Sequence, residues 1–311
     1  MNQLAYLAGV VSLAIGAMAP IAQANNGQFI NSASSNSSNV ANKMDAGKMN
    51  YYGGPVISNV KVYTVLWGDK VNPTIAAAMP GFYASMVNST YMDFLTVYNT
   101  TSVASQSGQG GSNQTIGRGT YAQTLTLNLD QSIMGLNSVD DTQIQAELER
   151  QALAGLIPSP DNNSLYMVHF PPGLTITGDD GKGGKASSCE QFCAFHNGFV
   201  TKSGANMFYG VIPDLDSPAC QFGCGVGSSM DRITVSASHE VMEAITDPFP
   251  TPGSTPGYPQ AWNTTDGMET GDLCQSNIAK LTGRTAKFKI QQIFDNSKNA
   301  CTNTPTYTSA I

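Results

Sequence analysis

Charged residues are scarce in this chain: Asp, Glu, Lys and Arg together make up 12% of its 311 residues. The acidic residues outnumber the basic ones, and the formal net charge is −7 at pH 7. A nucleic-acid-binding face has to be basic, and adsorption to anionic membranes needs clusters of Lys and Arg. The composition therefore argues against both partners. The abundant Asn, Ser, Thr and Gly are typical of an extracellular surface.

Long apolar runs are also missing, except at the N-terminus. Leu4 to Ala19 is almost wholly apolar, and Ala22-Gln23-Ala24 has the small-x-small pattern of a signal-peptidase site. The alternative is a membrane anchor, but Gly16 and Pro20 interrupt the run, which is shorter than the roughly 20 residues that span a bilayer. We expect a signal peptide at residues 1–24, cleavage near Ala24, and a secreted or periplasmic mature protein that is not in the membrane.

Cysteine is absent until Cys189, and all six cysteines lie in the C-terminal two fifths of the chain. An even number in an exported protein indicates disulfides. The competing interpretation is a zinc cluster, since two pairs have C-x3-C spacing. An oxidising compartment favours disulfides over free thiolates. We expect a bridge between Cys274 and Cys301, which leaves the pairing of the other four cysteines open.

The rest of the chain predicts an α+β (mixed α/β) fold with a central sheet. Residues 25–50, rich in Asn and Ser, are expected to be a disordered leader, and residues 51–304 a single compact domain. Apolar periodicity predicts helices at Pro80–Tyr98, Asp140–Gly155 and Thr234–Thr246. It predicts strands within Val56–Trp67, Tyr121–Leu129, Leu165–Phe170, Met207–Ile212 and Lys287–Ile293, the last of these being the final strand.

Histidine is rare as well, with three residues in the chain, and one of them begins the segment His239-Glu240-Val241-Met242-Glu243. On a helix, His239 and Glu243 share a face and can bind one metal ion, while Glu240 beside them can act as general base toward a water bound there. A carboxylate in place of the second His of H-E-x-x-H is a legitimate zinc ligand. It also makes manganese or calcium less improbable, although zinc is expected. The alternative is an amphipathic helix with these residues on a solvated face.

An acidic loop downstream offers a third ligand. Glu269 or Asp272 could complete the site, and Cys274 would hold that loop in place; the alternative is an acidic turn. His196, near Cys193, could bind the metal, stabilise the oxyanion formed during hydrolysis, or be structural. His169 alternates with apolar neighbours, which favours a buried core histidine. The serine-hydrolase motif G-x-S-x-G is absent.

These residues belong to a set of short landmarks that resembles the phosphate-induced protein 1 (EXORDIUM-like) family, most closely its microbial members. The landmarks are Tyr52-Gly53-Gly54-Pro55, Leu66-Trp67-Gly68, Cys193-Ala194-Phe195-His196, Ser238-His239-Glu240, Glu243-Ala244-Ile245-Thr246-Asp247-Pro248, Glu269-Thr270-Gly271-Asp272-Leu273-Cys274 and Phe294-Asp295-Asn296 before Cys301. They extend over nearly all of the chain after the leader. The resemblance implies an extracytoplasmic protein with a zincin-like domain, an active-site helix and a disulfide-linked C-terminal region.

Two functions follow as expectations. The first is a secreted zinc metallopeptidase, a monomer that acts on polypeptides, with Glu240 and His196 catalytic and with His239, Glu243, Glu269 and Asp272 as candidate metal ligands. The second is a non-catalytic extracellular protein that binds cell-wall glycan or a partner, with a structural or vestigial metal site. The plant members of the family, which resemble growth regulators of the cell wall, suggest the second. A glycosidase with paired carboxylates is a weaker third.

Overall fold

The computed structural model describes residues 26–29, 48–181, 183–250, 255–283 and 286–302. The expected signal peptide and most of the expected leader lie outside these residues. Within the leader, Asn26–Phe29 forms a strand, β1, that pairs antiparallel with a later strand of the main sheet. The expectation of a disordered leader is therefore wrong for this short segment.

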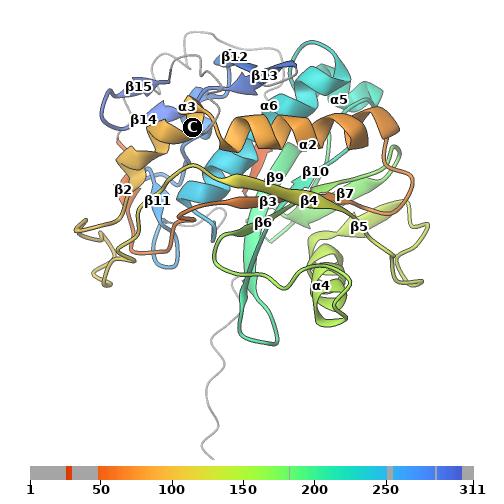
Figure 1. Cartoon of the computed structure of the whole chain (residues 1–311), viewed down its shortest axis with the longest axis horizontal. Helices are drawn as coiled ribbons and strands as arrows, with labels where there is room; N and C mark the ends of the chain where they lie inside the picture. The colour runs from red at the N-terminus through yellow and green to blue at the C-terminus, as the bar shows by residue number, and fades with distance from the viewer. Residues whose placement is uncertain (1–25, 30–47, 182, 251–254, 284–285, 303–311) are drawn as a thin grey trace, which may run out of the picture.

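The centre of the fold is a six-stranded mixed sheet (Figure 1). In order across the sheet its strands are β1 (Asn26–Phe29), β9 (Phe192–Val200), β10 (Asn206–Ile212), β6 (Ser164–His169), β3 (Lys61–Leu66) and β4 (Thr120–Thr126). The pairs β10–β6, β6–β3 and β3–β4 are parallel, and β9 runs antiparallel to β10. Every residue of β6 is buried, as expected for a parallel strand covered on both faces.

Helices cover both faces of this sheet. Figure 1 shows α2 (Pro73–Val87) and α6 (Ser229–Thr246) on one face and α4 (Asp141–Leu153) on the other. Successive strand residues alternate between the two faces, so Val62 packs in the core beneath α2 and α6 whereas Tyr63 packs in the core beneath α4. The helix that carries the candidate site is thus enclosed in the larger of two cores.

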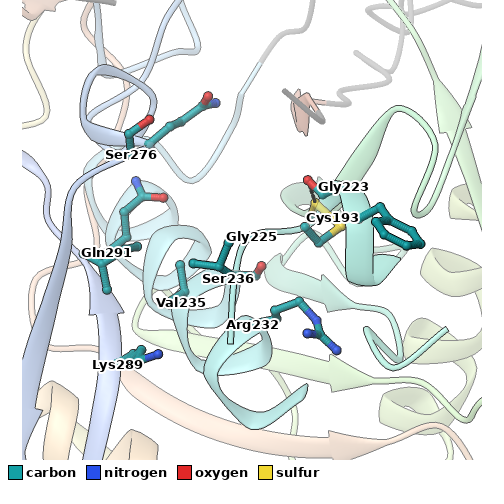
Figure 2. Close-up of a pocket in the computed structure, with 14 residues that line it drawn as sticks. Cys193, Gly223, Gly225, Arg232, Val235, Ser236, Ser276, Lys289 and Gln291 are labelled. Atoms are coloured by element: carbon teal, nitrogen blue, oxygen red, sulfur yellow. Dashed lines mark hydrogen bonds between the residues drawn. A yellow bond between two sulfur atoms is a disulfide. The ribbon is translucent and has the colours of Figure 1, made fainter. Parts of the chain in front are cut away.

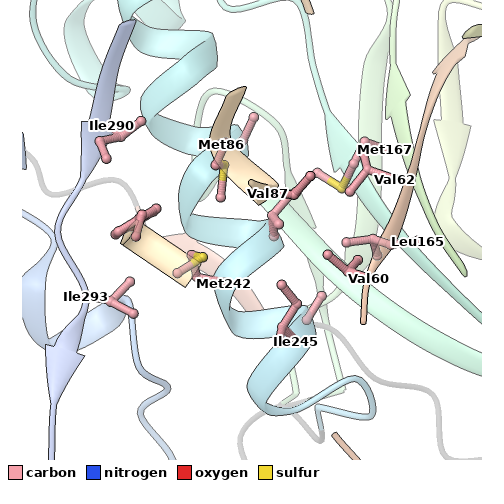
Figure 3. Packing of buried hydrophobic residues seen from close by; sticks show 14 of the residues in the cluster. Val60, Val62, Met86, Val87, Leu165, Met167, Met242, Ile245, Ile290 and Ile293 are labelled. Atoms are coloured by element: carbon pink, nitrogen blue, oxygen red, sulfur yellow. The ribbon is translucent and has the colours of Figure 1, made fainter. Parts of the chain in front are cut away.

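The remaining elements surround the sheet. They are β2 (Asn50–Tyr51) paired with β11 (Trp262–Asn263), the sheet β5 (Ser138–Asp140), β7 (Thr175–Asp179) and β8 (Lys185–Ser187), the hairpin β12 (Ile278–Thr282) and β13 (Lys287–Gln291), the pair β14 (Phe294–Asp295) and β15 (Ala300–Cys301), the helices α3 (Thr90–Asp93) and α5 (Pro218–Gly223), and the 3-10 helices η1 (Phe94–Tyr98) and η2 (Asp272–Cys274). The β12–β13 hairpin packs on α6, and Figure 3 shows Ile290 of β13 across the helix from Val60 and Leu165.

Several predicted boundaries shift in the structure. The helix expected over Pro80–Tyr98 begins earlier, at Pro73, and is interrupted where Ser89 caps the short helix α3. The helix expected from Thr234 begins at Ser229, and β13 is followed by two more short strands, so it is not the last. The expected strand over Val56–Trp67 narrows to Lys61–Leu66. The prediction of mixed helix and strand with a central sheet is confirmed.

All six cysteines form disulfides, which excludes the zinc-cluster interpretation of the C-x3-C pairs. The bonds are Cys189–Cys220, Cys193–Cys224 and Cys274–Cys301. The third is the predicted bridge. The first two join α5 and the residue after it to β9 and the turn before it. Three disulfides are consistent with an extracellular protein. In the described part of the chain, no helix has both the length and the apolar character needed to cross a membrane.

Candidate metal and active site

The site is built on α6, a helix whose start is well defined. Ser228 accepts a hydrogen bond from the backbone N–H of Asp231 at 3.1 Å, and Asp231 accepts one from the Ser228 N–H at 3.0 Å. Such a reciprocal capping box satisfies two N–H groups that a helix start leaves unpaired. From Ile233 onward almost every residue of the helix is buried. The three polar residues of the motif, His239, Glu240 and Glu243, therefore lie inside the protein, which contradicts the solvated-face alternative.

His239 and Glu243 are brought together as their spacing predicts. The Nε2 atom of His239 is 2.8 Å from Oε2 of Glu243. The other oxygen of Glu243 accepts hydrogen bonds from the backbone N–H groups of Gly271 and Asp272, at 3.0 and 3.1 Å. A carboxylate on the helix thus anchors the acidic loop that follows it in the sequence. The Asp272 carboxylate also approaches the ring, with Oδ1 3.8 Å from His239 Nε2.

The loop can come this close because residue 271 is glycine. A Cβ atom there would lie 2.5 Å from His239 Nδ1 and 2.9 Å from Oε1 of Glu243. Real Cβ atoms essentially never approach other atoms at these distances, so any other residue at position 271 would displace either the loop or the His239 and Glu243 side chains. The sequence gives no chemical signal for this role of Gly271, which appears there only as part of a landmark of the resemblance.

The amide of Gln291, on β13, fixes the orientation of the His239 ring from the side opposite Glu243. Its Nε2 atom is 2.7 Å from the carbonyl oxygen of Gly271 and 2.8 Å from His239 Nδ1. Burial would lower the pKa of His239, but the adjacent Glu243 carboxylate, with Glu240 and Asp272, raises it to about 10, which favours a proton on Nε2, facing Glu243. No sequence pattern predicts the contact between Gln291 and His239.

His196, on β9, enters the same cluster from the sheet. Its Nδ1 is 3.2 Å from Oε2 of Glu240, and its Nε2 is 3.0 Å from the backbone oxygen of Asp247 and 3.4 Å from Oε1 of Glu269. Burial alone would lower the pKa of His196, but the surrounding Glu269 and Glu240 carboxylates raise it well above its usual value. In its protonated form the ring can donate from both nitrogens, to Glu240 and to the backbone oxygen of Asp247. It holds Glu240 in place.

Asp247 joins the cluster although the sequence marks it only as the end of the helix. Its side chain is buried and accepts hydrogen bonds from the Ala261 N–H at 2.9 Å and from Asn263 Nδ2 at 2.5 Å. Burial, and then the nearby Glu269 carboxylate, raise its pKa to about 8. Its backbone oxygen orients His196. The one signal in the sequence is its position next to Pro248 in a landmark of the resemblance.

The cluster holds more acidic than basic groups in a buried space. Even with both imidazoles protonated, four ionised carboxylates would leave an excess of two negative charges, which has to be neutralised by bound protons or by a cation. Burial accordingly raises the pKa of Glu243 and of Glu269, while the neighbouring imidazoles oppose the rise. The members, all at most 2% exposed, are His196, His239, Glu240, Glu243, Asp247 and Glu269.

A metal ion fits this set of donors. The donor atoms of His239, Glu240 and Glu243 lie within 4.8 Å of one another, and so do those of His196, Glu243 and Glu269. Two ligands bound to one zinc ion are about 3 to 4 Å apart; the separations around His239 Nε2 are 2.8 Å to Glu243, slightly below this range, and 3.8 Å to Asp272, within it. In addition, Oε1 of Glu240 is buried without a hydrogen-bond partner among the described residues. The donors are nitrogen and oxygen, which suits zinc but also other divalent ions.

The other predicted residues are accounted for as well. Asp272 lies at the edge of the cluster with 23% of its side chain exposed, and its Oδ2 accepts a hydrogen bond from the Glu269 N–H at 3.0 Å. His169 takes no part in the cluster: it is buried on β6, where its Nε2 is 3.0 Å from the Tyr83 hydroxyl. Burial lowers its pKa to about 3. The interpretation of His169 as a core histidine is confirmed.

Comparison of the chain with protein-family models, curated proteins and solved structures finds no match. The resemblance to the EXORDIUM-like family therefore stays a prediction, and so does the zincin-like character of the domain. The chemistry of the site rests on its own geometry.

Proposed function

We propose that the protein is a secreted metal-dependent hydrolase that cleaves polypeptides. The observation that carries the proposal is the buried excess of carboxylates around His239, which includes an oxygen of Glu240 with no partner among the described residues. A divalent cation held by His239 and Glu243 would neutralise this charge, and a water bound to it would give the unpaired Glu240 oxygen a hydrogen-bond partner.

His239 and Glu243 would hold the cation, with Asp272 as the third ligand. Asp272 is preferred to Glu269 because it approaches His239 Nε2, at 3.8 Å, whereas Glu269 lies beside His196. When bound, the cation supplies a Lewis acid that polarises the scissile carbonyl and makes a water more acidic. A cation held at Nε2 would take the place of the proton that faces Glu243, while Gln291 would keep the ring in position through its contact with Nδ1 at 2.8 Å.

Residues of the chain would carry out the proton transfers and stabilise the oxyanion. Glu240 is the general base: one of its oxygens is fixed by His196 at 3.2 Å and the other is free to take a proton from the attacking water. It then delivers that proton to the leaving amine. The His196 cation, oriented by the backbone oxygen of Asp247, offers positive charge to the oxyanion that develops during attack. Burial of the cluster strengthens these interactions, since it excludes bulk water.

The second candidate function is a non-catalytic extracellular protein with a structural metal site. The burial of the cluster favours it, because among the described candidate ligands only Asp272 exposes a substantial part of its side chain. A structural site has a closed set of protein ligands, whereas a catalytic site keeps one position open for water. The two candidates therefore differ in whether a cation in this cluster can bind water or a small anion.

Elemental analysis of the purified mature protein, combined with a casein-cleavage assay, tests the proposal. We expect about one equivalent of a divalent metal, cleavage that EDTA abolishes, and recovery on adding back zinc but less with manganese or calcium. Protein without stoichiometric metal contradicts the hydrolase and leaves the second candidate only with a vestigial site. Stoichiometric metal without cleavage of casein or of a peptide library favours the second candidate, and a cobalt-substituted protein whose absorption spectrum does not respond to azide would support it further.

A further inference from the structure

A cavity of about 550 Å³ opens beside the cluster, between α6, the disulfide-linked helix α5 and the β12–β13 hairpin (Figure 2). This volume is in the range of natural ligand pockets. Its floor is formed by Val235 and Ser236 of α6, and one wall by Gln291 of β13. None of these residues stands out in the sequence, and none of them is a candidate metal ligand.

The cavity and the cluster are neighbours along one face of α6. Ser236 comes one helical turn before Glu240, and residues spaced by three or four positions lie above one another on a helix. Two glutamines also connect the two regions. Gln291 lines the cavity and contacts His239 Nδ1 at 2.8 Å, and Gln275 lines it and donates to Asp272 at 3.4 Å. A bound polypeptide lying over Asp272 would therefore pass directly from the cluster into the cavity.

The outer wall of the cavity is apolar and held firmly. Phe222 and Val226 line it and are 86% and 85% exposed, the largest exposures among the large apolar side chains described. The segment that carries them is linked to the main sheet by the Cys193–Cys224 disulfide, and α5 is held by the second, Cys189–Cys220. Exposed apolar side chains on a cross-linked wall indicate a preformed binding surface rather than a mobile loop tip.

The basic residues of the lining are already paired. The Lys289 ammonium is 3.0 Å from an Asp231 oxygen. The Arg232 guanidinium donates to the backbone oxygens of Leu215 and Gly227, at 3.0 and 2.7 Å. Because the protein's own residues engage these charges, the cavity offers little attraction for an acidic group. Its chemistry suits a neutral apolar one.

We infer that this cavity is a specificity pocket, which binds a bulky apolar side chain of an extended polypeptide while the neighbouring peptide bond lies against the cluster at Asp272. The inference rests on the proposed function for the cleavage step, but the binding itself does not require catalysis. The preferred substrates carry phenylalanine, leucine or methionine next to the cleaved bond, and acidic residues at that place are disfavoured.

The test uses capped glycine-rich peptides that carry a single central phenylalanine or aspartate. Binding is measured by calorimetry with the metal-loaded Glu240→Gln protein, which does not turn the peptides over, and cleavage is measured with the native chain. The rim variant combines Phe222→Ser with Val226→Ser. Its matched control is Val200→Ser, which removes an apolar side chain that is 62% exposed at the end of β9 and does not line the cavity.

We expect the phenylalanine peptide to bind at least tenfold more tightly than the aspartate peptide. The rim variant should lose at least tenfold of that preference, because it removes apolar contact area, whereas Val200→Ser keeps it. Equal binding of both peptides, or a preference that the rim variant retains, overturns the inference. If the peptides bind with the expected preference but the native chain cleaves neither, the pocket stands and the proposed hydrolase does not.

Discussion

Replacing Glu240 with glutamine exchanges one carboxylate oxygen for an amide group of almost the same size. The change removes a negative charge from the centre of the cluster and takes away the ability to accept a proton, but it leaves the volume of the core unchanged. For a general base, the loss of this function lowers kcat by about 10²- to 10⁴-fold. The metal content should not change, since Glu240 is assigned as the base and not as a ligand.

The effect on stability is expected to be small, because two contributions oppose each other. The variant weakens the charge-assisted contact with His196, which costs about 1.5 to 3 kcal/mol. It also removes a negative charge from a buried cluster that holds more acidic than basic groups, which returns a free energy of similar size, about 1 to 3 kcal/mol. The free energy of unfolding of the metal-free protein should thus change by no more than about 1 kcal/mol.

A matched control comes from another buried glutamate on the opposite face of the sheet. Both oxygens of Glu147 are engaged, by Arg150 at 2.7 Å on each and by Gln151 at 2.8 Å. Glu147→Gln weakens these contacts without relieving an excess of buried negative charge, and since Arg150 is 39% exposed the cost should be about 1 to 2 kcal/mol. The activity of this variant should equal that of the native chain.

Urea denaturation, metal analysis and initial rates on casein measure the three quantities for both variants. A Glu240→Gln protein that keeps its metal and cleaves casein within twofold of the native rate would refute the role of Glu240 as base. Loss of metal from this variant would instead make Glu240 a ligand. If Glu240→Gln lowered the free energy of unfolding by more than Glu147→Gln does, the residue would be a structural partner of His196.

Three further predictions follow from the structure. Binding of zinc to the apo-protein should release protons, because burial raises the pKa of Glu243 and Glu269; calorimetry in buffers of different ionisation enthalpy measures the number, and a value of zero contradicts the expected exchange of protons for the cation. His169→Gln should weaken the loss of stability at acid pH. The unfolded histidine binds a proton near pH 6.5, whereas the folded one does so only near pH 3. The native chain therefore loses about 3 kcal/mol of its free energy of unfolding between pH 7 and pH 4, and the variant retains it. Equal pH dependence of the two proteins in urea denaturation would contradict the assignment. Replacing both Cys274 and Cys301 with serine opens a loop closed over a separation of 27 residues and should lower the free energy of unfolding by about 3 to 4 kcal/mol, and a loss below about 1 kcal/mol would show that the loop stays ordered without the bond.

The parts of the fold that depend on neighbouring residues were predictable from the sequence. The helix α4, expected from Asp140 to Gly155, spans Asp141–Leu153 with Asp140 as its cap, because the capping residue and the apolar spacing are both local. The approach of His239 to Glu243 is likewise a property of a single helix. The start of α6 was predicted too late because its first turn, after Ser228, is polar and carries little apolar periodicity.

The contacts that assemble the site could not be predicted in the same way. His196 meets Glu240 because β9 lies next to β10 beneath α6, and Gln291 meets His239 because the β12–β13 hairpin folds back on the other side of the helix. Both contacts join residues more than 40 positions apart. Apolar patterns indicate which segments are strands, but the order of those strands in a sheet is a global property that the patterns do not encode.

The close approach of Gly271 to the helix has a consequence for finding related chains. Catalytic acids are frequent in any sequence, and an H-E-x-x-E segment with acids downstream arises easily by chance. A residue that must lack a side chain altogether, between Glu269 and Asp272, is a far stricter condition. A search that required this glycine together with the helix residues would separate chains able to close the loop on the helix from chains that contain only the H-E-x-x-E motif. The most discriminating position in such a pattern would be the one that performs no chemistry.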